Sequence, residues 1–193
     1  LKKQLDFKLE VYSLQKLMQD IKLGFPLTLN YIVDTIVNIG DRYVIAFFLG
    51  ATAVGYYNPA YVIGSLIILF AKVSGVVLPA LMSKLVDKGD EYKAQKMINY
   101  TIKGYLLLAI PFVVGSVVFS KPLLVVYTNE DISNNSYLIM PIIALGSIFY
   151  GLNIILSNVL FVRMKTVLMF RANALVVIVN LVLNLVFLYY FKD

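Results

Sequence analysis

Amide and ionisable side chains recur along one long apolar stretch of the sequence. Their positions step by four, four and three residues, and an arginine follows the last of them: Asn30, Asp34, Asn38, Asp41 and Arg42. Residues at this spacing share one face of an α-helix. An ionisable side chain inside a membrane costs at least about 2.5 kcal/mol on insertion scales, so it needs a partner or a hydrated cavity. The pattern predicts a cavity-lining helix, with Asp34 as a candidate site for a cation or a proton. The alternative is hydrogen bonding between helices, with Asp41 and Arg42 at the membrane interface.

A second polar face follows on the next apolar stretch. Its members are four, four and seven residues apart: Tyr57, Tyr61, Ser65 and Lys72. This spacing again places them on one side of a helix. The apolar residues 75–81 separate Lys72 from the basic loop that follows, so simple snorkelling is disfavoured and we expect Lys72 to face the cavity or to pair with Asp34. Tyr61 is predicted to lie in the cavity, whereas Tyr57 fits an interfacial aromatic belt.

The polar residues of the later apolar stretches are uncharged. They are Asn153, Ser157, Asn158, Asn173, Asn180 and Asn184. Hydrogen bonding between helices is the favoured interpretation, with each bond worth about 0.6 kcal/mol.

These polar faces belong to apolar blocks that are long enough to cross a membrane. Of the 193 residues, 60% are hydrophobic and only 15% are charged, against about 25% charged in a typical soluble domain. A helix of about 20 residues spans a hydrocarbon layer of roughly 30 Å. Five such blocks are predicted, at residues 24–49, 56–81, 101–126, 137–162 and 167–191. The expected fold class is all-α, a polytopic transmembrane helix bundle with five crossings.

Lysine and arginine residues predict the orientation of this bundle. They concentrate before the first block, between the second and third, and around the turn between the fourth and fifth, while Lys121 stands alone in the other two connections. By the positive-inside rule, the N-terminus is cytoplasmic. The odd number of crossings and the first residue, Leu1 rather than Met, indicate a piece of a larger protein.

The segment before the first block has a pattern of its own. Apolar residues recur there at roughly helical spacing, with lysines between them: Leu5, Leu9, Tyr12, Leu17 and Ile21. Residues 1–23 are therefore predicted to form an amphipathic helix on the cytoplasmic membrane surface, followed by the transmembrane domain 24–193. A plain soluble linker helix is the alternative.

Composition excludes several kinds of chemistry. The sequence contains no cysteine and no histidine, so disulfides, Cys or His metal sites and imidazole acid–base catalysis are ruled out. The acids Asp87, Asp90 and Glu91 lie among lysines and fit a solvated loop better than a metal site. The basic loops adjoin membrane blocks and lack interleaved aromatic residues, which argues against nucleic acid. We expect no metal, no cofactor, no catalytic residue and no nucleic-acid partner, and hence a transporter rather than an enzyme.

Several short motifs also follow one another in a particular order. They are Gly24-Phe25-Pro26, Asp41-Arg42, Leu49-Gly50, Gly55-Tyr56-Tyr57, Val77-Leu78-Pro79 and Lys165-Thr166, with Asn180 and Asn184 further on. Their order and spacing resemble the polysaccharide-transporter family of the MOP flippase superfamily. The resemblance covers nearly all of the chain and corresponds to part of the second half of such a transporter.

The resemblance implies that a polyprenyl-linked oligosaccharide is moved across the cell membrane by alternating access between two helix bundles. Arg42 and Lys72 would face the anionic head of this substrate, Asn38 and Tyr61 would be polar companions, and Asp34 would be an ion-coupling site for H⁺ or Na⁺. The implied partners are the lipid bilayer, the substrate and the missing N-terminal half. The resemblance implies a cationic cavity, and the acidic residue Asp34 does not fit this pattern. An ion-coupled MATE-type small-molecule exporter is therefore the alternative. A membrane-embedded transferase of sugar–lipid synthesis ranks last.

Overall fold

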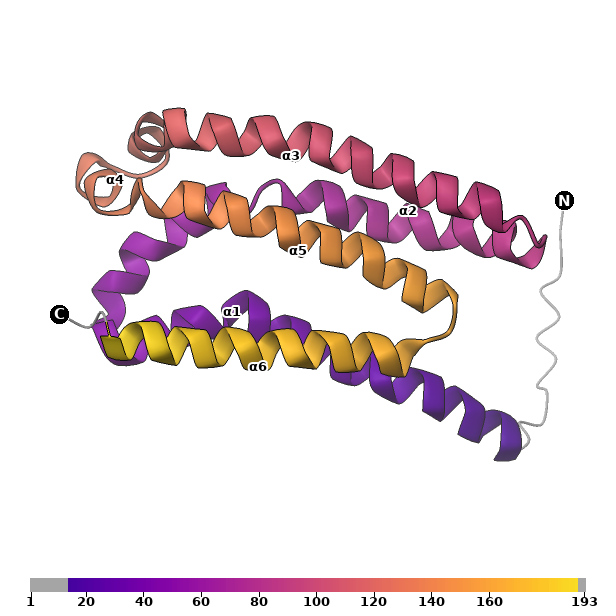
Figure 1. Cartoon of the computed structure of the whole chain (residues 1–193). Coiled ribbons are helices and arrows are strands. Elements are labelled where there is room, and N and C mark those ends of the chain that lie inside the picture. The colour runs from indigo at the N-terminus through magenta and orange to yellow at the C-terminus, as the bar shows by residue number, and fades with distance from the viewer. Residues whose placement is uncertain (1–13, 191–193) are drawn as a thin grey trace, which may run out of the picture.

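The computed structural model describes residues 14–190, and this part of the chain contains helices and no strands. The helices are α1 (Leu14–Gly64), α2 (Ile68–Asp87), α3 (Glu91–Tyr127), α4 (Glu130–Ser136), α5 (Ile139–Val162) and α6 (Thr166–Tyr190) (Figure 1). The predicted all-α fold is confirmed. Four stretches of the described chain are long and apolar enough to cross a membrane, namely α2, α3, α5 and Thr166–Asn184 of α6.

The first predicted block, 24–49, lies within α1. This helix is not among the four candidate spans, and the block carries three charged side chains, Asp34, Asp41 and Arg42. At Gly50 the backbone has φ 84° and ψ 172°, a conformation that glycine adopts far more readily than other residues. The helix therefore turns at Gly50 into a second segment, residues 51–64.

The second predicted block, 56–81, is divided between two helices. A turn at residues 65–67 separates α1 from α2 and contains tight i→i−3 hydrogen bonds, such as Leu66 N–H to the Ile63 carbonyl at 3.2 Å. Gly64, just before the turn, packs so closely on α5 that a Cβ there would lie 2.7 Å from the carbonyl oxygen of Met140. The chain is thus bent where it touches α5.

The helices form two layers. The part of α1 before Gly50 packs along α6, except for its first turns, which extend beyond the start of α6, whereas α2, α3 and α5 pack on one another in the second layer (Figure 1). The segment 51–64 of α1 passes from the first layer to the second at one end of the molecule (Figure 1). The short helix α4 lies in the connection from α3 to α5 and was not predicted. Its N-cap is Asn129, whose side chain accepts the Ile132 N–H at 2.9 Å.

The second layer contains a packed core. Its buried members are Ile67, Ala71, Leu78, Met82, Tyr105, Ala109 and Ile155. Tyr105 on α3 is 3% exposed, and its hydroxyl donates to the Ser147 carbonyl of α5 at 2.8 Å. Gly151 makes this contact possible, because a Cβ there would lie only 2.1 Å from the Tyr105 hydroxyl oxygen. Small residues at the crossing let the two backbones approach closely.

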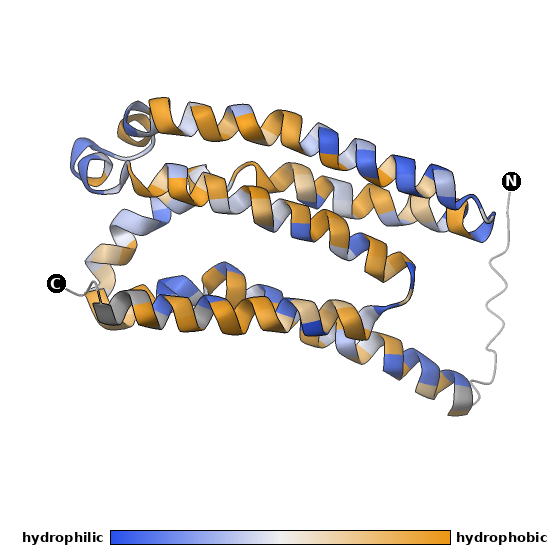
Figure 2. Cartoon of the chain, viewed as in Figure 1, coloured by the Kyte–Doolittle hydropathy of each residue, from blue (hydrophilic) through white to orange (hydrophobic). Residues whose placement is uncertain are grey.

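The outward faces of the helices are apolar. Val76 of α2, Leu107 of α3 and Val126 of α3 are each at least 74% exposed. Hydrophobic colour predominates along α3, α5 and α6, while hydrophilic residues gather on α4 at one end and toward the α2–α3 and α5–α6 connections at the other (Figure 2). This distribution is expected for helices that face lipid tails.

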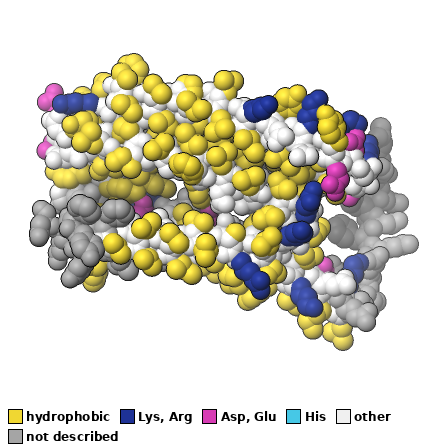
Figure 3. Space-filling view, viewed as in Figure 1, with side chains coloured by type: hydrophobic (Ala, Val, Ile, Leu, Met, Phe, Trp, Pro, Cys, Tyr) yellow, Lys and Arg dark blue, Asp and Glu magenta, His cyan; other side chains and the backbone are white. Residues whose placement is uncertain are grey.

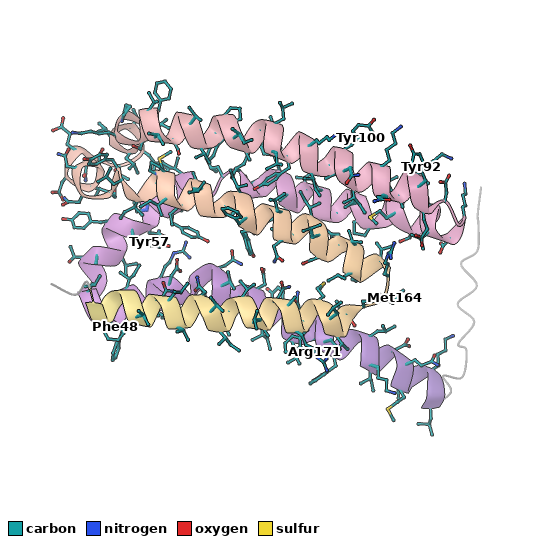
Figure 4. All side chains as sticks on the ribbon, viewed as in Figure 1. Phe48, Tyr57, Tyr92, Tyr100, Met164 and Arg171 are labelled. Atoms are coloured by element: carbon teal, nitrogen blue, oxygen red, sulfur yellow. The ribbon has the colours of Figure 1, made fainter. Side chains whose placement is uncertain are left out.

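Basic side chains gather at the same end, which we call the basic end (Figure 3). They include Lys84, Lys88, Lys93, Arg163 and Lys165, from the two connections and the helix turns next to them. The 37 residues of α3 make a helix of about 55 Å, longer than a hydrocarbon layer of roughly 30 Å. Its first turns, which carry Tyr92 and Tyr100, lie toward this end, where α2 also ends (Figure 4).

Two acidic residues at the start of α3, Asp90 and Glu91, have local partners. Asp90 is the N-cap of α3, where its side chain accepts the Lys93 N–H at 3.2 Å and the Lys93 ammonium group at 2.5 Å. These hydrogen bonds from Lys93 lower the pKa of Asp90 below its usual value. Glu91 lies 3.5 Å from the guanidinium group of Arg163, across to the end of α5. The solvated, charge-mixed loop predicted from the sequence agrees with these contacts.

The N-terminal amphipathic segment is described only in part, because Leu5, Leu9 and Tyr12 lie outside the described residues. From Leu14 onward the chain belongs to α1 and continues without a break into the first predicted block. Leu17 and Ile21 are about half exposed.

Candidate functional site in the cleft between the layers

The polar face of α1 meets α5 across the cleft between the two layers. The hydroxyl of Tyr150 donates a hydrogen bond to the Asp34 carboxylate and accepts one from the Asn38 side-chain amide at 3.1 Å. The same amide also lies 2.6 Å from the Asp34 carbonyl oxygen. Asp34, Asn38 and Tyr150 therefore form one hydrogen-bonded cluster that joins the layers at mid-helix.

A second cluster lies one turn further along α1, away from the basic end. The Asp41 carboxylate accepts the Tyr57 hydroxyl and the Arg42 backbone N–H, the latter at 2.9 Å. The Arg42 guanidinium group donates to the Asn38 carbonyl at 3.0 Å, and its carbon lies 4.4 Å from the centre of the Tyr61 ring. The Nε of Arg42 is buried without a hydrogen-bond partner. Tyr57 lies on the α1 segment that joins the layers, at the opposite end from Met164 and Arg171 (Figure 4).

Asparagines form a third connection between the layers. Asn173 of α6 donates to the Asn30 side-chain oxygen of α1 at 2.7 Å and accepts from the Asn153 amide of α5 at 3.1 Å. The predicted hydrogen bonding between helices is thus confirmed for Asn153 and Asn173.

The other late asparagines bond within their own helices. Asn184 donates to the side chain of Asn180 at 3.1 Å, and Asn158 donates to the Ile154 carbonyl at 2.9 Å. For these amide groups the predicted bonds between helices do not appear in the described structure. Their spacing on one helical face also allows bonding within the helix.

Two cavities occupy the cleft. The first, of about 350 Å³, is lined mainly by α1, α5 and α6, with Asn30, Asp34, Asn153, Ser157, Asn158 and Asn173 as its polar residues beside Tyr150. We call it the amide cavity. The second, of about 850 Å³, has Asn38, Asp41, Tyr57, Tyr61, Ser147, Tyr150, Asn153, Asn180 and Asn184 among its lining residues. We call it the tyrosine cavity. Acidic atoms are visible within the hollow between the layers (Figure 3).

Lys72 lines a third and smaller space, which we call the lysine cavity. It measures about 260 Å³ and shares Asn38, Tyr61 and Ile68 with the tyrosine cavity. Lys72 makes no ion pair with Asp34, whose carboxylate accepts from Tyr150 instead. Lys72 therefore lies beside this smaller space, and its expected position at the substrate stays a prediction. Arg42 lines none of these three cavities, because it lies against the Tyr61 ring.

The structure thus brings together Asp34, Asn38, Arg42 and Tyr61 on one side of the cleft, with Lys72 next to them. Tyr150 is a site residue that the sequence reasoning missed, and Tyr57, which was assigned to an interfacial belt, lines the tyrosine cavity. A signal was present, because Tyr150, Asn153 and Ser157 are three and four residues apart and so share a face of α5. Amide, phenol and hydroxyl groups, with a few charged ones, suit the binding of a polar molecule more than the making of covalent bonds.

Long apolar helices, a basic end and a polar cleft between two layers define a multi-pass membrane protein. Residues 26–186 match the model of the MatE family, so the chain belongs to this family of membrane transporters, within the MOP superfamily. The resemblance to that superfamily is confirmed, and so is the prediction of a transporter rather than an enzyme.

Two more distant relatives carry names that refer to glycans. The chain is 25% identical over 146 residues to a protein of Haloferax volcanii named as a probable low-salt glycan biosynthesis flippase, covering 76% of this chain and 31% of that protein. It is also 25% identical over 130 residues to a protein of Shigella flexneri named as an O-antigen transporter, covering 67% of this chain and 30% of that protein. The chain therefore spans about a third of the length of these relatives. No solved structure matches the chain.

Proposed function

We propose that this chain is part of a flippase that moves lipid-linked glycan precursors across the cell membrane by alternating access. The observation that carries this proposal is the polar cleft between two helix layers in a member of a transporter family. The names of the two relatives support a glycan substrate carried on a lipid. The remaining two thirds of the protein would include the opposing helix bundle that closes the substrate path.

In this proposal the chain crosses the membrane five times, with the basic end in the cytoplasm. The first crossing is the polar block of α1, and the second is made jointly by residues 51–64 and α2. The gathering of Lys and Arg at one end supports this orientation. Leu14 to Leu23 of α1, with the residues before them, would lie along or beyond the cytoplasmic surface of the membrane.

The substrate's anionic phosphate head would bind next to Lys72, Asn38 and Tyr61, which line the lysine cavity together. Arg42 would act from behind the Tyr61 ring, adding positive charge and holding the ring in place. A buried guanidinium nitrogen without a partner is an available hydrogen-bond donor for such a head when the site opens.

The test is glycan flipping by the intact transporter in proteoliposomes. Lys72→Gln and Arg42→Gln are each expected to lower the flipping rate at least tenfold, because each removes a cation near the phosphate head. The matched controls are Lys103→Gln and Arg171→Gln, which remove exposed cations outside the three cavities and should keep the rate within twofold. Normal flipping by the Lys72→Gln/Arg42→Gln double variant at normal protein level would refute the assignment.

The second candidate function is an ion-coupled small-molecule exporter of the MATE type. The family match and the Asp34 carboxylate in the cleft favour it. Coupling to H⁺ or Na⁺ would require the Asp34 carboxylate to release the Tyr150 hydroxyl and bind the ion in its place. If this function is correct, Asp34→Asn abolishes efflux of cationic drugs from cells, and if the flippase is correct, drug resistance does not depend on Asp34.

A further inference from the structure

The amide cavity and the tyrosine cavity follow one another along the same helices. On α1, residues 30–37 line the first and residues 37–45 line the second. On α5 the corresponding stretches are 150–161 and 142–153, and on α6 they are 169–176 and 176–184. The two cavities are therefore successive parts of one cleft, with the amide cavity nearer to the basic end.

Four residues line both cavities and so form the layer between them: Val37, Tyr150, Asn153 and Val176. Tyr150 carries the largest side chain of the four. It is also the one with hydrogen bonds to groups on opposite sides of the layer. Asp34, which accepts from its hydroxyl, lines the amide cavity, whereas Asn38, which donates to it, lines the tyrosine cavity.

We infer that Tyr150 is the partition of this cleft, a positioning residue whose ring separates the two cavities and whose movement joins them into one passage. The hydrogen bonds to Asp34 and Asn38 fix the ring across the cleft. Both partners are on α1, in the other layer, so a shift of one layer against the other breaks these bonds and frees the ring. Tyr150 is the largest of the four side chains that separate the two cavities.

The energetic cost of opening is small enough for a working cycle. Each hydrogen bond between membrane helices contributes little net stability, because the freed groups find other partners or water. Asp34 and Asn38 each face a cavity that can hold water, so their released groups are not left in an apolar environment. The partition is thus held in place by bonds that can be exchanged.

The absence of cysteine from these 193 residues makes the test direct. Ser157→Cys places a thiol in the amide cavity, and Gly146→Cys places one in the tyrosine cavity, where a Cβ meets no atom within 4 Å. Both are introduced into the intact transporter, freed of any cysteines outside this chain and reconstituted in vesicles of known orientation. A membrane-impermeant cationic methanethiosulfonate reagent is then added on the side away from the basic end.

With Tyr150 present, Gly146→Cys should react and Ser157→Cys should be protected. Tyr150→Ala should raise the reaction rate of Ser157→Cys at least tenfold. Tyr150→Phe keeps the ring but loses both hydrogen bonds, so it should produce a smaller rise. Tyr105→Phe is the matched control, because this hydroxyl also links α5 to a neighbouring helix but lies in the packed core, and it should change neither rate.

The inference is overturned if Ser157→Cys reacts equally fast with and without the Tyr150 side chain while Gly146→Cys still reacts. It is also overturned if Ser157→Cys is already fully reactive from that side in the presence of Tyr150. Should Tyr150→Ala fail to fold, Tyr150→Phe still decides the matter, because an unchanged reaction rate of Ser157→Cys contradicts the role of the hydroxyl.

The partition is an element of the transport path proposed above. Because the labelling needs no substrate, a positive result alongside normal glycan export by the Lys72 and Arg42 variants would reject the flippase and keep the partition.

Discussion

The two sides of α5 differ in how they pack, as the surroundings of two tyrosines show. Tyr105 of α3 is almost fully buried, and its hydroxyl bonds a backbone carbonyl beside Gly151. Tyr150, on α5 itself, is half-buried and bonds side chains of α1 across cavities. One side of α5 is thus a close-packed interface, and the other is a cleft held by polar side chains.

The difference indicates which part of the bundle can move. A packed interface loses many small dispersion contacts at once if it separates, so α2, α3 and α5 should move as a unit. The cleft is bridged by a few exchangeable hydrogen bonds next to cavities that are large enough to hold water. Residues 14–49 of α1, with α6, can therefore shift against the other layer, and the break at Gly50 and the turn at 65–67 are the places that can absorb the change in direction.

The largest effect is expected in the packed interface, at Gly151. Gly151→Ala places a methyl group 2.1 Å from the Tyr105 hydroxyl oxygen, so the ring or the helix must move. Overpacking of this kind costs typically about 1–3 kcal/mol. The control on the same helix is Gly146→Ala, where a Cβ meets no atom within 4 Å and no loss is expected. Thermal unfolding of the detergent-solubilised transporter measures both, and equal melting temperatures for the two variants would mean that this interface is not tightly packed.

A smaller effect is expected in the cleft, at Asn173. Asn173→Ala removes two hydrogen bonds that link α6 to α1 and α5, for a loss of about 1 kcal/mol. Asn158→Ala is the control, since Asn158 lines the same cavity but its amide donates only within α5. Denaturation of the two variants under the same conditions should show a difference of this size. A loss larger than that of Gly151→Ala would reverse the comparison between the two sides of α5.

The sequence predicted the features that follow from local pattern. Apolar blocks gave the helices, and the four-residue spacing of Asn30, Asp34 and Asn38 placed them correctly on one face of α1. The division of the second block could not be predicted, because it depends on the contact of Gly64 with the Met140 backbone, two residues far apart in the sequence.

The hydrogen-bond partners of the polar groups could not be predicted either, because they also lie far apart in the sequence. Asp34 was expected to line a cavity or to hydrogen-bond another helix, with Lys72 as a possible partner. In the structure it lines the amide cavity and its carboxylate bonds Tyr150, a partner that is decided by how α5 lies against α1. Arg42 was expected to face the substrate directly, a role that remains a proposal, and in the structure its guanidinium group lies against Tyr61. The sequence spacing predicts which polar residues share a helical face. It does not predict which two faces pack together, because that depends on the tertiary structure.

The smallest effect lies outside both interfaces, at the start of α3. Asp90 caps this helix and its pKa is lowered by the hydrogen bonds from Lys93, so ionised Asp90 stabilises the folded helix start. Because the folded-state pKa is depressed, this contribution is present above the unfolded pKa of about 3.9 and is lost as the pH falls through the folded value. Asp90→Ala should therefore speed amide hydrogen exchange in the first turn of α3 at neutral pH relative to the parent, and the exchange rates of the two proteins should converge as the pH falls below 4.

Exchange across the cleft, at Asn38 and Tyr150, should be the same in both proteins, because the cap lies beyond the membrane-facing part of α3. If the difference at the helix start persisted undiminished at low pH, the cap would owe its strength to the shape of the side chain rather than to its charge.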